Sequence, residues 1–201
     1  MLQSLRTKGR ISRHQAGWLA LMLLVLLLAA GVRFYGLDVQ SLWYDEGVAY
    51  GHSLRTLPEI IEAVSNNVHV PAYFTLLSAW QDLTGSSEFA LRALSVLMSL
   101  VSVALAYALG KRLFSPLAGL SAAIFVALNS FSIYYAQETR MYAMLAAIAT
   151  GSMWVFVGWV LALHRQASRP ALIRQSLLLG LINALGLYTH YSYGLVILAQ
   201  A

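Results

Sequence analysis

The sequence predicts an all-α integral membrane protein, a multi-span helical bundle, from its composition, its long uncharged stretches and the placement of its charges. Of its 201 residues, 59% are hydrophobic and 10% are charged, whereas about 25% of residues are charged in an average soluble domain. Several uncharged stretches are long enough to cross a hydrocarbon layer of about 30 Å as helices. The chain contains no cysteine, which excludes disulfides, thiolate metal ligands and a cysteine nucleophile.

The charged residues separate along the chain, and this separation predicts the topology. Nine of the thirteen lysines and arginines lie in three segments that contain no acid, residues 6–13, 111–112 and 165–174. All eight acids lie in the other two interhelical regions. Loops rich in Lys and Arg stay on the cytoplasmic side, so we expect the basic segments inside and the acids outside. The net charge of +5 is then a topology signal, and we expect no nucleic acid partner.

The first expected elements are a basic leader over residues 1–15 and a span over residues 16–32. These 17 uncharged residues are the lower limit for a helix that crosses the membrane. A cleaved signal peptide is the alternative, but its apolar core runs for only about 7–15 residues. We favour an uncleaved first helix that runs outward, followed by an outer loop over residues 33–92.

This outer loop is expected to carry two interfacial helices. Residues 56–59, Thr-Leu-Pro-Glu, have the form of a capping box, and apolar residues recur on one helical face through Val64. After Pro71, the apolar run over residues 72–83 would span only about 18 Å as a helix. We expect this run to be interfacial or re-entrant, because counting it as a span would place Lys111 and Arg112 outside.

Further spans are expected over residues 93–110, 116–137, 141–163 and 173–189. We expect a turn near residues 189–192 and the start of a sixth span over 192–201, with one long helix over 175–201 as the alternative. The sequence stops inside an apolar run. We therefore expect residues 1–201 to be the N-terminal part of one transmembrane domain of a truncated chain.

Polar and aromatic side chains gather at the expected outer ends of these spans. They are Asp45, Glu46, His69, Arg92, Glu138, Arg140, Tyr142 and His190. The planar fork of arginine matches phosphate oxygens, and a carboxylate can take the proton of an attacking hydroxyl. A sugar leaving a lipid phosphate needs no acid because the departing phosphate is a stable anion, so one carboxylate suffices, unlike in most glycosidases.

Asp45 and Glu46 are expected to have different roles, because adjacent residues on a helix point about 100° apart. We assign Asp45 as the base and Glu46 to orienting the acceptor or supporting the site. A solvated pair of loop carboxylates is the simpler interpretation. The arginines can equally be interfacial anchors, and the exposed tyrosines and tryptophans can form the aromatic belt of a membrane protein.

A divalent metal is a further possibility at this level of the membrane. Two carboxylates and two imidazoles, from Asp45, Glu46, His69 and His190, are suitable ligand types. Their spacing in the sequence matches no metal motif, so we assign no metal ligand.

Five segments resemble polytopic glycosyltransferases with a GT-C fold, in the family of bacterial proteins similar to protein O-mannosyltransferases, lipid A aminoarabinose transferases and lipid A core galacturonosyltransferases. These segments are residues 43–46 (Trp-Tyr-Asp-Glu), 69–74, 87–92, 110–114 and 135–142. They lie within about residues 37–142, and Val70 departs from the family's common His-Pro-Pro.

The resemblance implies that Asp45 is the catalytic base and that Arg92, Arg140 and His190 serve the lipid phosphate or the acceptor. It also implies a second half of the chain that completes the acceptor site. We therefore do not expect residues 1–201 to be active alone.

We expect an inverting membrane glycosyltransferase at the outer, periplasmic face of the bacterial cytoplasmic membrane. It would move a hexosyl or pentosyl group from a polyprenyl-phosphate donor to a lipid, glycan or protein acceptor among membrane lipids. A transporter or lipid flippase is the alternative, but transporters place polar groups near the bilayer centre, whereas the expected spans contain no charged residue. A structural subunit that docks a partner would tolerate neutral replacement of Asp45 and Arg140.

Overall fold

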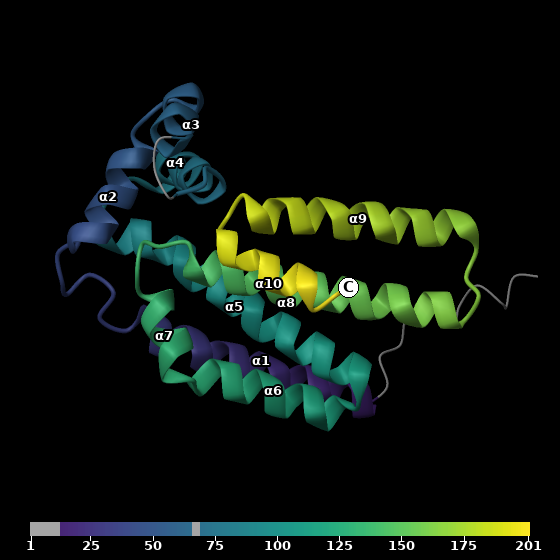
Figure 1. Ribbon diagram of the computed structural model, residues 1–201. Helices are drawn as coiled ribbons and strands as arrows, with labels where there is room; N and C mark the ends of the chain where they lie inside the picture. The colour runs from purple at the N-terminus through teal and green to yellow at the C-terminus, as the bar shows by residue number, and fades with distance from the viewer. Residues whose placement is uncertain (1–12, 66–68) are drawn as a thin grey trace, which may run out of the picture.

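The computed structural model describes residues 13–65 and 69–201, and its regular secondary structure is helical throughout these residues (Figure 1). The basic leader before Arg13 and the break expected at residues 66–67 lie outside the described residues. The long helices are α1 (Arg13–Phe34), α5 (Glu88–Leu113), α6 (Pro116–Leu128), α8 (Tyr142–His164) and α9 (Arg169–Leu187). The shorter ones are α2 (Tyr44–Ser53), α3 (Leu57–Ser65), α4 (Ala72–Thr84), α7 (Ser130–Ala136), the 3-10 turn η1 (Tyr191–Tyr193) and α10 (Gly194–Leu198).

Within the described residues, four helices are long and apolar enough to cross a membrane, α1, α5, α8 and α9. The bent pair of α6 and α7 makes a fifth if it counts as one span. The long helices run side by side, and α2, α3 and α4 lie together at one end of the bundle (Figure 1). The predicted fold class, an all-α multi-span membrane protein, is confirmed.

The helix predicted to run continuously over residues 116–137 is broken at Asn129, where α6 and α7 meet with a bend of 60°. Asn129 has an extended backbone, and its side-chain oxygen accepts the amide N–H of Ser132 at 3.0 Å. Asparagine is a favoured helix N-cap, so it starts α7 afresh. The carbonyl oxygens of Val126 and Ala127 at the end of α6 accept hydrogen bonds from Arg33, at 3.0 and 2.8 Å. A helix end that would otherwise leave carbonyls unpaired is thereby satisfied.

Arg33 and Gln137 join the end of α1 to the segment where α6 and α7 meet and to the end of α7. The Arg33 side chain is fully buried, and a charge at that depth is tolerated only when it is paired or hydrogen-bonded. In return, the Gln137 amide donates to the carbonyl oxygens of Arg33 and Tyr35 at 3.2 and 3.0 Å, at the end of α1. These contacts fix where the chain leaves α1 and enters the outer loop.

The outer loop is packed against the bundle. A cluster of buried side chains joins α2, α3 and α4 to the N-terminal ends of α5 and α8, with Ile60, Phe74, Leu91 and Met144 among its members. The amide of Ala72, at the start of α4, donates to the carbonyl oxygen of Tyr188 at 3.0 Å. Segments more than a hundred residues apart are thus brought to one end of the molecule.

At the other end of the bundle, α5 packs closely on α8 through Arg112. Its guanidinium lies 3.9 Å from the centre of the Trp154 ring and donates to the Trp154 carbonyl oxygen. A side chain at Gly158 would place its Cβ 2.6 Å from an Arg112 nitrogen, so glycine makes this contact possible. Arg112 therefore packs two helices together in addition to marking the inner end of α5.

Candidate functional site

The two adjacent acids begin α2, and their side chains separate. Trp43 precedes the helix with an extended backbone, and its amide donates to Glu46 at 3.3 Å. Acids in the first turn are favoured by the partial positive charge of a helix N-terminus. Glu46 is fully buried, whereas the Asp45 side chain is 37% exposed. The Asp45 side chain therefore faces the surface of the protein, and the Glu46 side chain faces the interior.

Glu46 is held by Arg92 and by the backbone of Thr139. The Arg92 Nε and Nη2 atoms donate to its two carboxylate oxygens at 2.9 and 2.7 Å, a bidentate pair. The Thr139 amide donates to it at 2.8 Å. Burial alone would raise the pKa of Glu46, but the hydrogen bonds from Arg92 and Thr139 outweigh it and hold the pKa below its ordinary value. Glu46 is thus a buried side chain held from two sides, and both of its expected roles, orienting the acceptor and supporting the site, stay predictions.

Arg92 uses its remaining donors inside the protein. Its Nη1 atom donates to the carbonyl oxygens of Leu37 and Gln40 at 2.8 and 2.7 Å, and Nη2 also donates to Ser41 at 3.2 Å. A guanidinium carries five N–H groups, and all five are engaged. Each donor of Arg92 already has a partner in this structure, and the expectation that Arg92 contacts a lipid phosphate stays a prediction.

Arg140 differs in this respect. Its Nη2 atom lies 3.5 Å from a carboxylate oxygen of Asp45, an ion pair longer than an ordinary hydrogen bond. Nη1 donates to the Asp45 carbonyl oxygen at 3.3 Å. The Arg140 Nε atom is buried and has no hydrogen-bond partner among the described residues. The guanidinium also lies 5.7 Å from the Tyr142 ring centre. Arg140 therefore lies beside Asp45 with fewer of its N–H groups engaged than Arg92 has.

His190 and His69 lie close to this pair. The His190 Nδ1 atom accepts the Ser192 amide at 3.1 Å, which places the proton of the neutral ring on Nε2. The His190 ring is centred 6.0 Å from that of Tyr142. Burial lowers the pKa of His69, with a further lowering from Arg140 that Asp45 opposes. His69 thus lies within electrostatic reach of Asp45, Arg140 and His190.

His52 is a member of this region that the sequence analysis missed. Its ring centre lies 6.2 Å from that of His69 and 4.8 Å from that of Phe74. Burial lowers its pKa, followed by the charge of Arg55. His52 stands seven residues after Asp45, a spacing that places two residues on the same helical face, and this was the available signal.

Glu138 faces another part of the outer end. Only 7% of the surface of Glu138 is exposed, and its carboxyl group accepts a hydrogen bond from the Tyr134 hydroxyl. Burial raises the pKa of Glu138, and the hydrogen bond from Tyr134 opposes that rise. Glu138 lines a pocket of about 740 Å³ together with Glu46 and Arg92, whereas Asp45 does not line it.

An apolar groove begins at Tyr142 and runs between α8 and α10. Its first part, about 410 Å³, is lined by Tyr135, Tyr142 and Leu145 among others, and its second part, about 390 Å³, shares Ala149 and Val196 with the first. Such a surface accommodates a hydrocarbon chain. The groove starts beside the ring that Arg140 and His190 approach.

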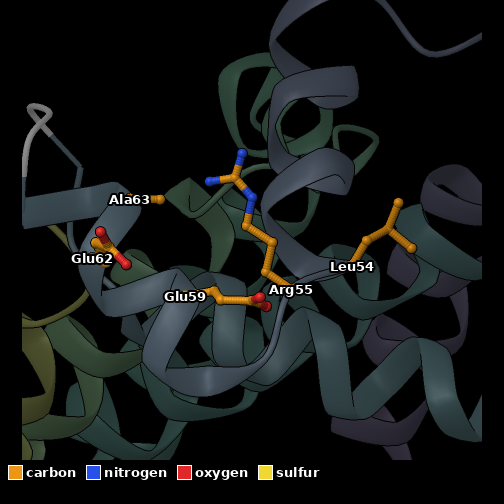
Figure 2. Close-up of a pocket in the computed structure, with 5 residues that line it drawn as sticks. All are labelled: Leu54, Arg55, Glu59, Glu62 and Ala63. Carbon is orange, nitrogen blue, oxygen red and sulfur yellow. The ribbon is translucent and has the colours of Figure 1, made fainter.

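A separate cleft lies between the end of α2 and α3 (Figure 2), lined by Leu54, Arg55, Glu59, Glu62 and Ala63. The Glu59 carboxylate accepts the Thr56 amide and hydroxyl, both at 2.8 Å, and thereby caps α3. In Figure 2 the Arg55 guanidinium points away from Glu59. The Arg55 and Glu59 side chains do not point toward a common centre. Because Glu59 serves to cap α3, we assign this cleft no binding role.

The metal alternative receives no support from the structure. Within the described residues, no group of three or more His, Cys, Asp or Glu side chains is arranged to hold an ion. Glu46, one of the four possible ligands, is already bound to Arg92.

Comparison with known proteins adds an independent finding. The family model described as dolichyl-phosphate-mannose-protein mannosyltransferase matches residues 68–201, two thirds of the sequence. The matched range includes Arg140 and His190 and begins after Asp45. No curated protein and no solved structure matches the chain at a significant level.

Proposed function

This chain belongs to the dolichyl-phosphate-mannose-protein mannosyltransferase family, and from that premise we propose that it transfers a sugar from a polyprenyl-phosphate donor to an acceptor at the outer face of the cytoplasmic membrane. Membership in this family confirms the resemblance predicted from the motifs. It makes the protein a membrane glycosyltransferase of the mannosyltransferase type. The lipid-linked sugar and an acceptor are its substrates in general terms.

Asp45 is the general base of this reaction. The acceptor hydroxyl attacks the anomeric carbon, the bond from that carbon to the phosphate oxygen breaks, and its electron pair leaves with the phosphate. The hydroxyl proton passes to the Asp45 carboxylate as the new bond between oxygen and carbon forms, and the anomeric centre is inverted. General-base assistance of this kind contributes about 10²- to 10⁴-fold to the rate.

Arg140 and His190 receive the donor phosphate. The contacts of Arg140 to Asp45, at 3.3 and 3.5 Å, are long enough to yield to a phosphate oxygen. The Nε2–H group of His190 supplies another donor. A guanidinium and a second N–H donor suit the developing charge on a departing phosphate.

The polyprenyl chain follows the apolar groove that starts at Tyr142. The groove lies between α8 and α10, so the hydrocarbon continues along the membrane spans while its phosphate stays at their outer ends. The donor's amphipathic character thus matches a polar site joined to an apolar groove.

The orientation follows from the placement of charges. Asp45 lies on α2 at one end of the bundle, and the turn between α8 and α9, with Arg165 and Arg169, lies at the other end (Figure 1). Basic loops remain cytoplasmic, so we assign the end with Asp45 to the outer face. The same rule keeps the N-terminus cytoplasmic and makes a bacterial inner membrane the proposed location.

The observation that carries this proposal is the contrast between the two acid–arginine pairs. Glu46 and Arg92 are buried and saturated, whereas Asp45 is 37% exposed beside an arginine with a spare donor. A base must reach the acceptor, and a phosphate ligand must have donors free. Asp45 and Arg140 satisfy both requirements.

The test is Asp45→Asn in the enzyme reconstituted in lipid nanodiscs with a radiolabelled polyprenyl-phosphate sugar. We expect transfer to fall by about 10²- to 10⁴-fold while donor binding, measured by filter retention, stays within about threefold. Asp38→Asn is the matched control, because Asp38 is an exposed acid in the same outer loop. Turnover near the unmodified level in Asp45→Asn would remove Asp45 from the role of base.

A further inference from the structure

The pocket of about 740 Å³ beside Glu138 is distinct from the surface where Asp45 and Arg140 meet. Its lining comes from the start of the outer loop, from the Glu46 and Arg92 pair and from the end of α7. The lining residues that matter here are Tyr35, Trp43, Tyr134, Gln137 and Glu138. Its volume lies within the range of about 300–1,000 Å³ that is usual for small-molecule sites.

Two polar side chains, the buried Arg92 and the half-buried Gln137, hold the wall of this pocket in place. Arg92 donates to the carbonyl oxygens of Leu37, Gln40 and Ser41, and Gln137 donates to that of Tyr35 at 3.0 Å. The loop over residues 35–43 is thus fixed before any ligand arrives. A wall that is already ordered lowers the entropy cost of binding.

The side chains that face this pocket suit a carbohydrate. Tyr35, Trp43 and Tyr134 keep 85, 47 and 58% of their surfaces exposed, so their rings are available for the apolar face of a sugar. Glu138 offers a buried carboxyl group for sugar hydroxyls. Aromatic surfaces with a few fixed polar groups are the usual composition of such sites.

The charges of the pocket disfavour a phosphate. The positive charge of Arg92 is offset by its bidentate pair with Glu46, and its five donors are engaged. Glu138 adds a further carboxyl group, so the lining holds two acids and one arginine. A phosphate would meet like charge here, whereas a neutral polyol would not. The donor phosphate and the ligand of this pocket are therefore different groups.

We propose that this pocket binds the hydroxyl-rich headgroup of a neutral glycolipid, which is the acceptor of the reaction. This proposal rests on the proposed transferase function and adds the chemical class of the acceptor. The sugar stacks on Trp43 and Tyr35, and Glu138 accepts a hydrogen bond from one of its hydroxyls. The glycolipid's hydrocarbon chains remain in the bilayer, because the pocket lies where α1 and α7 reach their outer ends.

The turn over residues 138–140 links the acceptor pocket to the proposed base. Glu138 faces the pocket, the Thr139 amide binds Glu46, and the Arg140 guanidinium meets Asp45. Three consecutive residues thus contact three different parts of the site, which are the acceptor pocket, the buried Glu46 and the proposed base Asp45. A headgroup in the pocket and a phosphate at Arg140 would approach Asp45 from two sides.

The experiment uses the enzyme in nanodiscs with a glucosyl diacylglycerol that carries a photoreactive diazirine on its sugar. We expect irradiation to label residues 35–43 or 134–138, and peptide mapping identifies them. Trp43→Ala and Tyr35→Ala each remove an exposed ring and should lower the labelling yield about two- to tenfold. Phe114→Ala is the matched control, because Phe114 is an aromatic residue with 80% exposure at the other end of α5.

Labelling does not require turnover, so this test is separate from the test of the base. Asp45→Asn should label like the unmodified enzyme even though it does not transfer. The proposal is overturned if the label falls outside the pocket, if yields in Trp43→Ala and Tyr35→Ala equal that of Phe114→Ala, or if sugar-free diacylglycerol competes equally well. If Asp45→Asn lowers transfer as expected and one of these labelling results is also obtained, the proposed transferase function stands and the proposed acceptor site is rejected.

Discussion

Replacing Glu46 by glutamine should destabilise the fold strongly, because Arg92 would keep its buried charge without a counter-ion. Removing one partner of a buried ion pair costs about 3–5 kcal/mol. The glutamine oxygen can still accept one of the hydrogen bonds that Glu46 receives from Arg92 and Thr139, so we expect about 3 kcal/mol for Glu46→Gln. Glu46→Ala loses every acceptor and should cost about 5 kcal/mol.

The assay is reversible unfolding in mixed detergent micelles, monitored by circular dichroism and compared with Asp38→Asn. That exposed acid should change the free energy of unfolding by no more than about 0.5 kcal/mol. The double variant Glu46→Gln, Arg92→Met should be more stable than Glu46→Gln alone, because it removes the unpaired charge. A loss below about 1 kcal/mol for Glu46→Gln, or no recovery in the double variant, would refute the assigned role of the pair.

The same pair predicts how acid affects stability. The pKa of Glu46 is lower in the folded protein than its ordinary value of 4.5, so its contribution is complete above that ordinary value. It is lost as the pH falls through the lower folded-state pKa, because protonation then removes the counter-ion of Arg92. Unfolding measured from pH 7 downward should show this loss only below about pH 4.5, and Glu46→Gln should flatten that part of the curve.

Three glycines offer further tests in thermal unfolding. Gly158→Ala places a methyl group 2.6 Å from Arg112 and should cost about 1–3 kcal/mol. Gly180→Ala, with no described atom within 4 Å of the new Cβ, should be neutral or stabilise α9 by up to about 1 kcal/mol. Gly186→Ala brings its new Cβ against the buried ring of Tyr193 and should cost about 3 kcal/mol, because that ring cannot move as the end of an arginine can. Equal melting temperatures for Gly186→Ala and Gly180→Ala would contradict this packing.

The sequence was sufficient for the class of fold because composition and span length are local properties. It did not reveal the break at Asn129, since the apolar pattern continues through it and the cap to Ser132 requires the chain to turn. The partner that makes the break tolerable, Arg33, lies on another helix. Pairing between distant segments follows from packing, and a single sequence does not record it.

In the candidate site, too, local features follow from the sequence, whereas contacts between distant segments do not. The spacing of Asp45 and Glu46 correctly predicts that their side chains separate, because helix geometry fixes that angle. Arg92 and Arg140 look alike in the sequence, as each ends an outer segment near an acid. Only the acceptors around them show that one guanidinium is fully used and the other is not.

The position of Arg140 for binding the donor phosphate depends on the hydrogen bonds that occupy the donors of Arg92. Glu46 is tied to Arg92 on α5 and to the amide of Thr139, and the next residue along the chain is Arg140. Asp45 is likewise the residue next to Glu46. The Glu46 and Arg92 pair therefore sets the positions of both Asp45 and Arg140 through single peptide units, each rigid and planar. A change that loosens Glu46 should displace the base and the phosphate ligand relative to each other, and losses of about 1 Å in such alignment can cost 10²-fold in rate. Transfer by Glu46 variants should consequently fall further than their folded fraction does.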